Sequence, residues 1–207
     1  MAHLPPFQEW IVQLVSMISN ALLGIAAVFG IFRLWQWRSE LIGRSKYQLA
    51  RKIVLLALQF REEYHYARGM FTFGDEAAGR ERSQNETEAE SRVMDEYHSR
   101  IKRLQLLQRT LRRVHEASWE ADIVLKQGDS PLTKPLGDAY SDLATSIRFL
   151  FDAELKQAKS PSGHMSIKES DLRELHDTVY GVSNDPIGQK VENAVDVIKA
   201  RLTKYLR

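Results

Sequence analysis

The run of residues 11–32, IVQLVSMISNALLGIAAVFGIF, contains no charged side chain and constrains the chain more than any other feature. As an α-helix it would extend roughly 33 Å, at about 1.5 Å per residue. The hydrocarbon core of a bilayer is about 30 Å thick. Tryptophans, whose indole rings favour the headgroup layer, flank the run at positions Trp10, Trp35 and Trp37. The run therefore predicts a transmembrane helix within an anchor of residues 1–33.

The flanks of this run predict its orientation. A buried core helix and a cleaved signal peptide are the alternatives to a span, but residues 1–10 lack the Lys or Arg of a signal peptide. The residues after the run are basic, namely Arg33, Arg38, Arg44, Lys46, Arg51 and Lys52. Because basic flanks stay cytoplasmic, we expect a single-pass protein with its N-terminus outside and residues 34–207 in the cytoplasm. The expected membrane-interface residues are Trp10, Arg33, Trp35, Trp37 and Arg38.

Polar side chains interrupt the apolar run, and most of them share one face. At about 100° per residue, five residues fall within a sector of roughly 80°. These residues, here called the polar stripe, are Gln13, Ser16, Asn20, Gly24 and Ala27. Isolated uncharged polar residues are tolerated in many spans, yet amides that face lipid lack hydrogen-bond partners. Against the same stripe of a second copy the amides can pair, while glycine and alanine allow close approach. The stripe thus predicts a homo-oligomer in the bilayer and, more narrowly, a ring around a pore.

The rest of the chain predicts helices. Apolar residues recur at steps of three and four, and the expected helices are 34–69, 88–127, 138–158, one that begins at Ser166 or Ser170 and ends near Tyr180, and one from Asp185 and Pro186 to about Tyr205. Residues 71–91, FTFGDEAAGRERSQNETEAES, predict a mobile loop with solvated acidic side chains. No segment alternates long enough for a strand. The expected fold is therefore all-α, with one N-terminal transmembrane helix followed by a cytoplasmic bundle of four or five helices.

Composition and motifs offer little catalytic chemistry. The chain has no cysteine, which excludes disulfides, thiolate nucleophiles and cysteine-bound zinc. Its formal net charge of +2 gives no general argument for a nucleic-acid partner. The tetrads EEYH (62–65) and DEYH (95–98) have the carboxylate–histidine spacing of di-iron bundles. Such sites need further carboxylates, and the sequence does not place any, so we expect neither a metal nor a cofactor.

One helix carries a candidate pair for RNA chemistry. In RTLRRVH, Arg109 and His115 have the arginine–histidine spacing of HEPN-type helical ribonucleases, and such a pair could activate a ribose hydroxyl and stabilise phosphorane charge. In a straight helix the two side chains lie about 120° apart, so a shared site requires a bend, a helix end or a second subunit. A basic cluster on the same helix could hold RNA phosphates, or its members could pair with carboxylates of the acidic stretch just upstream. The members are Arg100, Lys102, Arg103, Arg109, Arg112 and Arg113.

The segments WRSELIGRSKYQLA (37–50) and ARGMF (67–71) resemble uncharacterised bacterial proteins that have one N-terminal span and a helical cytoplasmic domain. The layout is also similar to the small membrane accessory proteins of type VI-B CRISPR systems, which accompany an RNA-guided, RNA-cutting effector. This resemblance implies a divergent HEPN-like domain and assembly into pores of the bacterial inner membrane. It also implies that Arg109 and His115 match a degenerate pair with a structural role.

We therefore expect a non-enzymatic, self-associating inner-membrane protein that alters membrane permeability in antiphage defence. Its expected partners are the lipid bilayer, further copies of itself, and RNA or an RNA-guided effector protein; no small-molecule substrate is evident. Two alternatives stay open. One is a membrane-tethered HEPN-type ribonuclease that uses Arg109 and His115, and the other is a non-enzymatic scaffold that docks a partner protein at the membrane.

Overall fold

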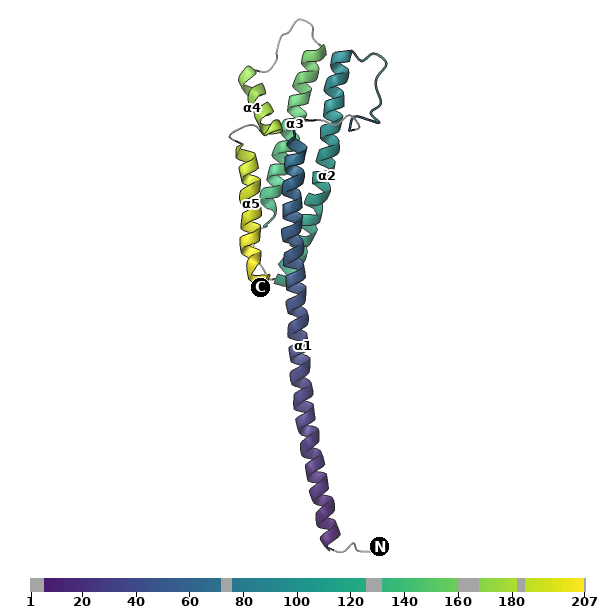
Figure 1. Ribbon diagram of the computed structural model, residues 1–207, viewed down its shortest axis with the longest axis vertical. Helices are drawn as coiled ribbons and strands as arrows, with labels where there is room; N and C mark the ends of the chain where they lie inside the picture. Colours follow the sequence, from purple (N-terminus) through teal and green to yellow (C-terminus); the bar gives the residue numbers. More distant parts are fainter. Residues whose placement is uncertain (1–5, 72–75, 126–131, 160–167, 182–184, 207) are drawn as a thin grey trace. The chain divides into compact units, whose positions relative to one another are not determined.

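The computed structural model describes residues 6–71, 76–125, 132–159, 168–181 and 185–206. All regular structure in these ranges is helical (Figure 1). The elements are α1 (Pro6–Arg68), α2 (Glu88–Leu125), α3 (Lys134–Lys159), α4 (Glu169–Tyr180), α5 (Pro186–Leu202) and a short 3-10 helix η1 (Thr203–Tyr205). The expectation of an all-α chain is confirmed.

Residue contacts divide the chain into two units, Met1–Lys46 and Tyr47–Arg207. The expected anchor boundary at residue 33 follows hydropathy, whereas this division follows contacts, so the two boundaries report different properties. The described part of the first unit is entirely helical, and α1 contains an apolar window with mean hydropathy 2.1, none of it buried. This helix is long and apolar enough to span a membrane.

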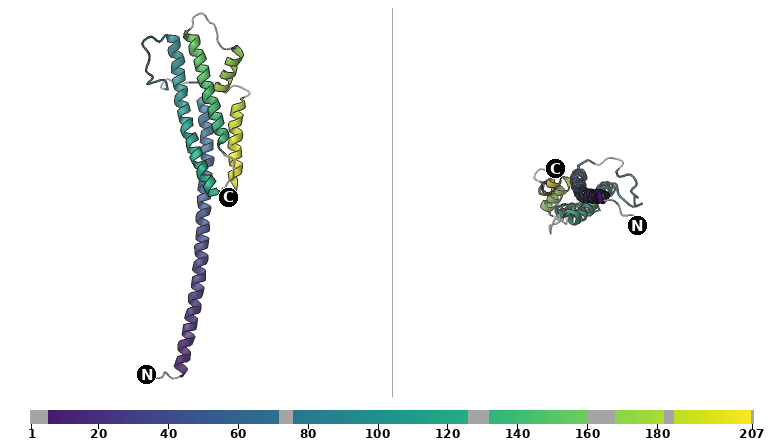
Figure 2. Two further views of the ribbon diagram at one scale, coloured as in Figure 1. Left: turned by 180° about the vertical axis from the view of Figure 1, so that it is seen from behind. Right: turned by 90° about the horizontal axis from the view of Figure 1, so that it is seen from below.

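The second unit packs its helices around an apolar core, with α3 in contact with α2, α4 and α5 (Figure 2). The end of α1 joins this core through residues spaced by three and four positions. They are Leu49, Ala50, Ile53, Leu56, Ala57, Phe60, Tyr64 and Ala67. The same spacing places Leu104, Leu107, Leu111 and Val114 of α2, and Leu136, Ala139, Leu143, Ile147 and Leu150 of α3, in the core. Amphipathic periodicity thus explains which face each helix buries.

Local signals fix several helix ends. The backbone N–H of Gly188 donates to Asp185 over 2.9 Å, and Pro186 occupies the first turn of α5, as the sequence predicts. Helix α2 begins in a reciprocal capping box: the N–H of Glu90 donates to Thr87 Oγ1 over 3.2 Å, and that of Thr87 donates to Glu90 Oε2 over 2.7 Å.

Two expected helix starts are wrong. Helix α3 begins at Lys134 rather than near residue 138, because a proline such as Pro135 fits the first turn of a helix. Helix α4 has Lys168 at its N-cap without a side-chain cap, and Ser170 lies inside the helix. The alternative cap, Ser166, lies outside the described residues.

The acidic segment before α2 is held by arginines. Arg80 Nε donates to Asp95 over 2.6 Å and its Nη1 donates to Glu86 over 2.8 Å. Glu76 accepts from Arg103 Nε over 3.0 Å. The expectation of solvated acidic side chains is therefore wrong for Glu86 and Glu76, because Arg80 and Arg103 reach them. Asp95, which lies in α2, shares Arg80 with Glu86.

Candidate functional site

The polar stripe lies on α1 in the first unit, where all five of its side-chain positions are exposed. A Cβ added at Gly24 would meet no atom within 4 Å. Beside it lies a shallow apolar hollow of about 550 Å³, lined by Ala21, Gly24, Ile25, Val28, Phe29 and Phe32. A side chain from outside the chain could occupy this hollow, which is how small residues admit a neighbouring helix.

The expected membrane-interface residues are also exposed on α1. Trp10, Trp35 and Trp37 are 59%, 75% and 60% exposed. Arg33 places its guanidinium 5.7 Å from the centre of the Phe29 ring, and Arg38 is exposed. Aromatic and cationic side chains therefore follow the apolar run directly, in the order that suits a membrane–water boundary.

The HEPN-like pair is not brought together. Both residues lie on α2, where Arg109 is exposed and His115 is half-buried. His115 packs beside the start of α3, since a Cβ added at Gly137 would lie 3.7 Å from its Nε2. Within the described residues, no hydrogen bond joins Arg109 to His115. The helix continues through both positions, so neither a bend nor a helix end creates a shared site.

The basic cluster proposed for RNA is divided between the interior and the surface. Arg100 and Arg103 are 0% and 2% exposed. Arg100 Nη1 donates to the carbonyl of Ala67 over 2.8 Å, and Arg103 Nη1 donates to those of Tyr66 and Gly69 over 3.2 Å each. These carbonyls end α1, where helical partners are missing and the helix dipole favours a cation.

Of the remaining members, Lys102 is half-buried and donates to the carbonyls of Glu76 and Ala78 over 2.8 Å each. Arg109, Arg112 and Arg113 stay exposed. Interpreting all six as one phosphate-binding surface is therefore wrong, because the burial of two of them serves the end of α1.

A third buried arginine serves α4 in the same way. Arg68 is 3% exposed, and its Nε donates to the carbonyl of Thr178 over 2.9 Å. It also pairs with Asp185, the N-cap of α5. One guanidinium therefore joins α1 to the end of α4 and to the beginning of α5, although the sequence gives no local sign of it.

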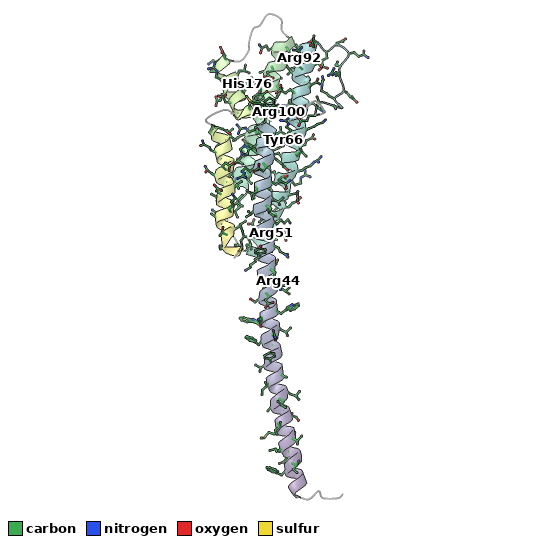
Figure 3. The ribbon with its side chains drawn as sticks, viewed as in Figure 1. Arg44, Arg51, Tyr66, Arg92, Arg100 and His176 are labelled. Atoms are coloured by element: carbon green, nitrogen blue, oxygen red, sulfur yellow. The ribbon has the colours of Figure 1, made fainter. Side chains whose placement is uncertain are left out.

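A polar cluster, here called the junction cluster, lies where α2, α3 and α4 meet (Figure 3). Glu96 accepts from Tyr180 Oη over 2.8 Å and lies 3.5 Å from Arg100 Nη2. That ion pair is long, and Arg100 Nη2 makes no hydrogen bond within the described structure. Glu154 Oε1 lies 3.3 Å from His176 Nε2, and the His176 ring stacks on Tyr180 at 5.3 Å.

Burial dominates the electrostatics of the junction cluster. It raises the pKa of Glu154 to about 7, with a further upward contribution from Glu96 and an opposing one from Arg100. Burial, followed by the hydrogen bond to Glu96, also raises the pKa of Tyr180. At neutral pH Glu154 is therefore poised between its neutral and charged forms. Periodicity places Glu154 on a helix but cannot reveal this environment.

The two carboxylate–histidine tetrads do not converge. In the first, Glu62 pairs with Arg61 and His65 lies 3.1 Å from Glu192. In the second, Asp95 pairs with Arg80. No group of three or more side chains able to hold a metal ion occurs in the described ranges of the chain.

An open groove of about 820 Å³ lies between α2 and α3. Its lining is largely aromatic and aliphatic, and includes Met94, Tyr97, Tyr140, Phe149, Phe151 and Leu155. Phe149 is 58% exposed, and the Tyr97 and Phe151 rings pack at 5.4 Å. The groove is a surface on which an apolar side chain of another molecule could rest.

Comparison of the whole chain with protein-family models, with curated proteins and with solved structures gives no match.

Proposed function

We propose that this chain is a single-span membrane protein that self-associates through the polar stripe of α1. The observation that carries the proposal is the exposure of Gln13 and Asn20 on the part of α1, residues 11–32, whose other side chains are mostly apolar and, where described, exposed. In hydrocarbon an unpaired amide is costly, and a soluble environment would leave the apolar side chains in water. With a second copy in the bilayer, the amides can pair with each other and the apolar side chains can contact lipid.

The free energies of contacts between helices in a membrane favour an association that is cooperative but modest. One interhelical hydrogen bond in a membrane contributes about 0.6 kcal/mol, and up to roughly 1.7 kcal/mol. Two amides in each helix and close packing at Gly24 act at the same contact. Several copies multiply that contact, so a closed ring is more stable than a pair of helices.

The proposed consequence of assembly is a change in membrane permeability. In a ring, the part of the stripe that the neighbouring helix does not cover faces the axis, and its polar groups there meet water, as a polar lumen requires. The basic residues after the span place the second unit in the cytoplasm of a bacterial cell. The resemblance to membrane accessory proteins of type VI-B CRISPR systems extends the proposal to antiphage defence, with the second unit receiving the trigger.

Replacing the two stripe amides tests the proposal. Gln13→Leu with Asn20→Leu keeps the span apolar but removes the paired groups. We expect smaller particles in mild detergent, measured by light scattering after size-exclusion chromatography, and less dye entry into expressing cells. The matched control is Ser19→Leu, because Ser19 lies about 120° from Gln13 around the helix. Unchanged particle size and dye entry in the double variant would contradict the proposal.

A docking scaffold is the second candidate, and the groove between α2 and α3 is the observation that favours it. A scaffold requires the exposed Phe149 but no pore. Phe149→Ser would then abolish its role while leaving dye entry unchanged, whereas a pore former loses dye entry in the stripe variant. The ribonuclease alternative has less support, because α2 holds Arg109 and His115 on different sides.

A further inference from the structure

Beyond the apolar run, two arginines and a tryptophan share one side of α1. Arg44 follows Arg33 by eleven residues, which places the two side chains about 20° apart around the helix. Trp37 lies about 40° from Arg33. All three are exposed, and Trp37 is 60% exposed. This side is here called the basic face, and around the helix Arg33 lies about 140° and Trp37 about 100° from Asn20, in the middle of the stripe.

The charges of the basic face are not neutralised by the chain itself. Neither Arg33 nor Arg44 forms an ion pair within the described residues. Glu40 occupies the same side of the helix, about 20° from Arg33, and leaves the face with a net positive charge. In the second unit, by contrast, the buried Arg68 and Arg103 each have a carboxylate partner. The basic face therefore has the charge of a surface that binds anions.

The same face is hollowed next to the apolar run. Gly30 has no side chain, and a Cβ there would meet no atom within 4 Å. The resulting hollow, about 430 Å³ in volume, is lined by Gly30, Arg33, Leu34, Gln36, Trp37 and Glu40. Arg33 extends its guanidinium over the Phe29 ring, toward the apolar run. A cation, an indole and an apolar gap thus lie together at the end of the span.

We infer that the basic face binds the headgroups of anionic phospholipids in the leaflet at the basic end of the span. A phosphodiester matches the planar donors of Arg33, the indole of Trp37 suits the headgroup layer, and the hollow at Gly30 leaves room for an acyl chain. Arg44 adds attraction from slightly farther along the helix (Figure 3). The inference relies on the proposed span, and it assigns lipid to the side that self-association leaves uncovered.

Trp37 itself can report the bound lipid. In the full chain, Trp10→Phe, Trp35→Phe and Trp119→Phe leave it as the remaining tryptophan. The protein is reconstituted in bilayers in which phosphatidylglycerol or phosphatidylcholine carries brominated, quenching acyl chains. We expect phosphatidylglycerol to occupy the site about fivefold more strongly than phosphatidylcholine does. A fivefold preference is the attraction expected of one arginine near an anionic membrane surface.

Two charge variants locate the effect. Arg33→Gln with Arg44→Gln should reduce the preference for phosphatidylglycerol to nearly none. Lys46→Gln should retain it, because Lys46 lies about 140° from Arg33 around the helix and farther along the chain from the apolar run. An equal loss in both variants would overturn the assignment to this face.

The result separates this inference from the proposed function. Equal quenching by both lipids in the parent protein would overturn the lipid preference and leave the span intact. Quenching by neither lipid would overturn the span, and the lipid inference with it. Particle size, measured on the same samples, should remain unchanged in the Arg33 and Arg44 variant, because neither arginine lies in the sector of the stripe.

Discussion

Arginines behave in opposite ways in the two units. In the second unit Arg68, Arg100 and Arg103 are buried, and each donates to carbonyls at a helix end. In the first unit Arg33 and Arg44 are exposed and have no ion pair in the described residues. The same side chain therefore completes the fold in one unit and is available to other molecules in the other.

Apolar residues show the same contrast. Leu22, Leu23 and Val28 in the first unit are 61%, 68% and 68% exposed, while Leu107 and Leu143 of the second are fully buried. The second unit supplies its own apolar core and its own partners for buried polar groups. The described part of the first unit supplies neither, which is why we propose that it contacts lipid and further copies.

The largest expected effect comes from breaking a buried arginine contact in the second unit. Arg103→Gln removes the cation that faces Glu76, and it removes donors to the carbonyls of Gly69 and Phe71. Loss of one member of a buried charge pair costs about 3–5 kcal/mol. We expect this loss in the free energy of unfolding, measured by chemical denaturation in mild detergent with far-UV circular dichroism.

The matched control for that variant is Arg109→Gln on the same helix. Arg109 is exposed, so its loss should change the free energy of unfolding by less than about 0.5 kcal/mol. Equal effects of the two substitutions would remove the distinction between buried and exposed arginines on which the comparison depends.

Glu154 is a carboxyl group of the second unit whose charge is disfavoured by burial, and it predicts a pH dependence. Its pKa is raised from 4.5 to about 7, so the folded state keeps a proton that the unfolded state has lost between these values. The associated stability is present below pH 4.5 and is lost as pH rises through 7. Glu154→Gln cannot ionise and should stabilise the protein at pH 8 by about 3 kcal/mol.

At pH 5 the same substitution should stabilise the protein by only about 1 kcal/mol, because Glu154 is then neutral in the folded protein and still partly neutral in the unfolded one. Chemical denaturation of the parent protein and of the Glu154→Gln variant at pH 5 and at pH 8 measures the change in stability at each pH. Asp152 offers a control, because it is an exposed acid on α3 that pairs with Lys156, and Asp152→Asn should show no comparable difference. A variant at Glu154 that gains no stability at pH 8 would indicate that the junction cluster is open to water.

The sequence predicts the elements of this fold because their signals are local. The limits of α2, the end of α4 and the Asp185 cap of α5 follow from periodicity and from neighbouring residues. The exposed stripe on α1 also follows from periodicity, since every fourth or third residue of a helix shares a face. Because the stripe residues are exposed in the described structure, no knowledge of the folded second unit is needed to find them.

The interior of the second unit could not be predicted in this way. Arg100 and Arg103 have the composition of a nucleic-acid surface, and only the packing of α2 against the end of α1 shows that they are buried. Glu154 and His176 come from different helices, and their meeting depends on how α3 and α4 pack. Periodicity identifies a face, but it does not identify the partner of that face.

Two small residues of the first unit provide a test of its proposed contact with other copies. Gly24 belongs to the stripe and has open space around it, whereas the exposed Ala26 lies about 160° from Gly24 around α1. Gly24→Ile should weaken self-association by about 0.6 kcal/mol or more per helix contact, the average contribution of an interhelical hydrogen bond. Ala26→Ile should leave association unchanged. Particle mass as a function of protein concentration in detergent distinguishes them, and identical behaviour would contradict the assigned face.

The smallest effect is expected where a helix end is completed by neighbouring residues alone. Thr87→Ala removes the hydroxyl that accepts from the N–H of Glu90, and it should lower the free energy of unfolding by about 1 kcal/mol. Glu90 still accepts from the backbone of Thr87, a contact that lowers the pKa of Glu90. The stability that this contact contributes is present above the ordinary pKa of a glutamate, and it is lost as pH falls through the lowered pKa of Glu90.

Thr87→Ser keeps the hydroxyl and is the control for this cap, with an expected loss near zero. Both free energies come from the same denaturation experiment as the Arg103 variant. Because the capping box lies far along the chain from the stripe, particle size should remain unchanged in both variants. A change in particle size would show that the second unit takes part in assembly. It would contradict the contrast between a second unit that only completes its own fold and a first unit that makes the contacts with other copies.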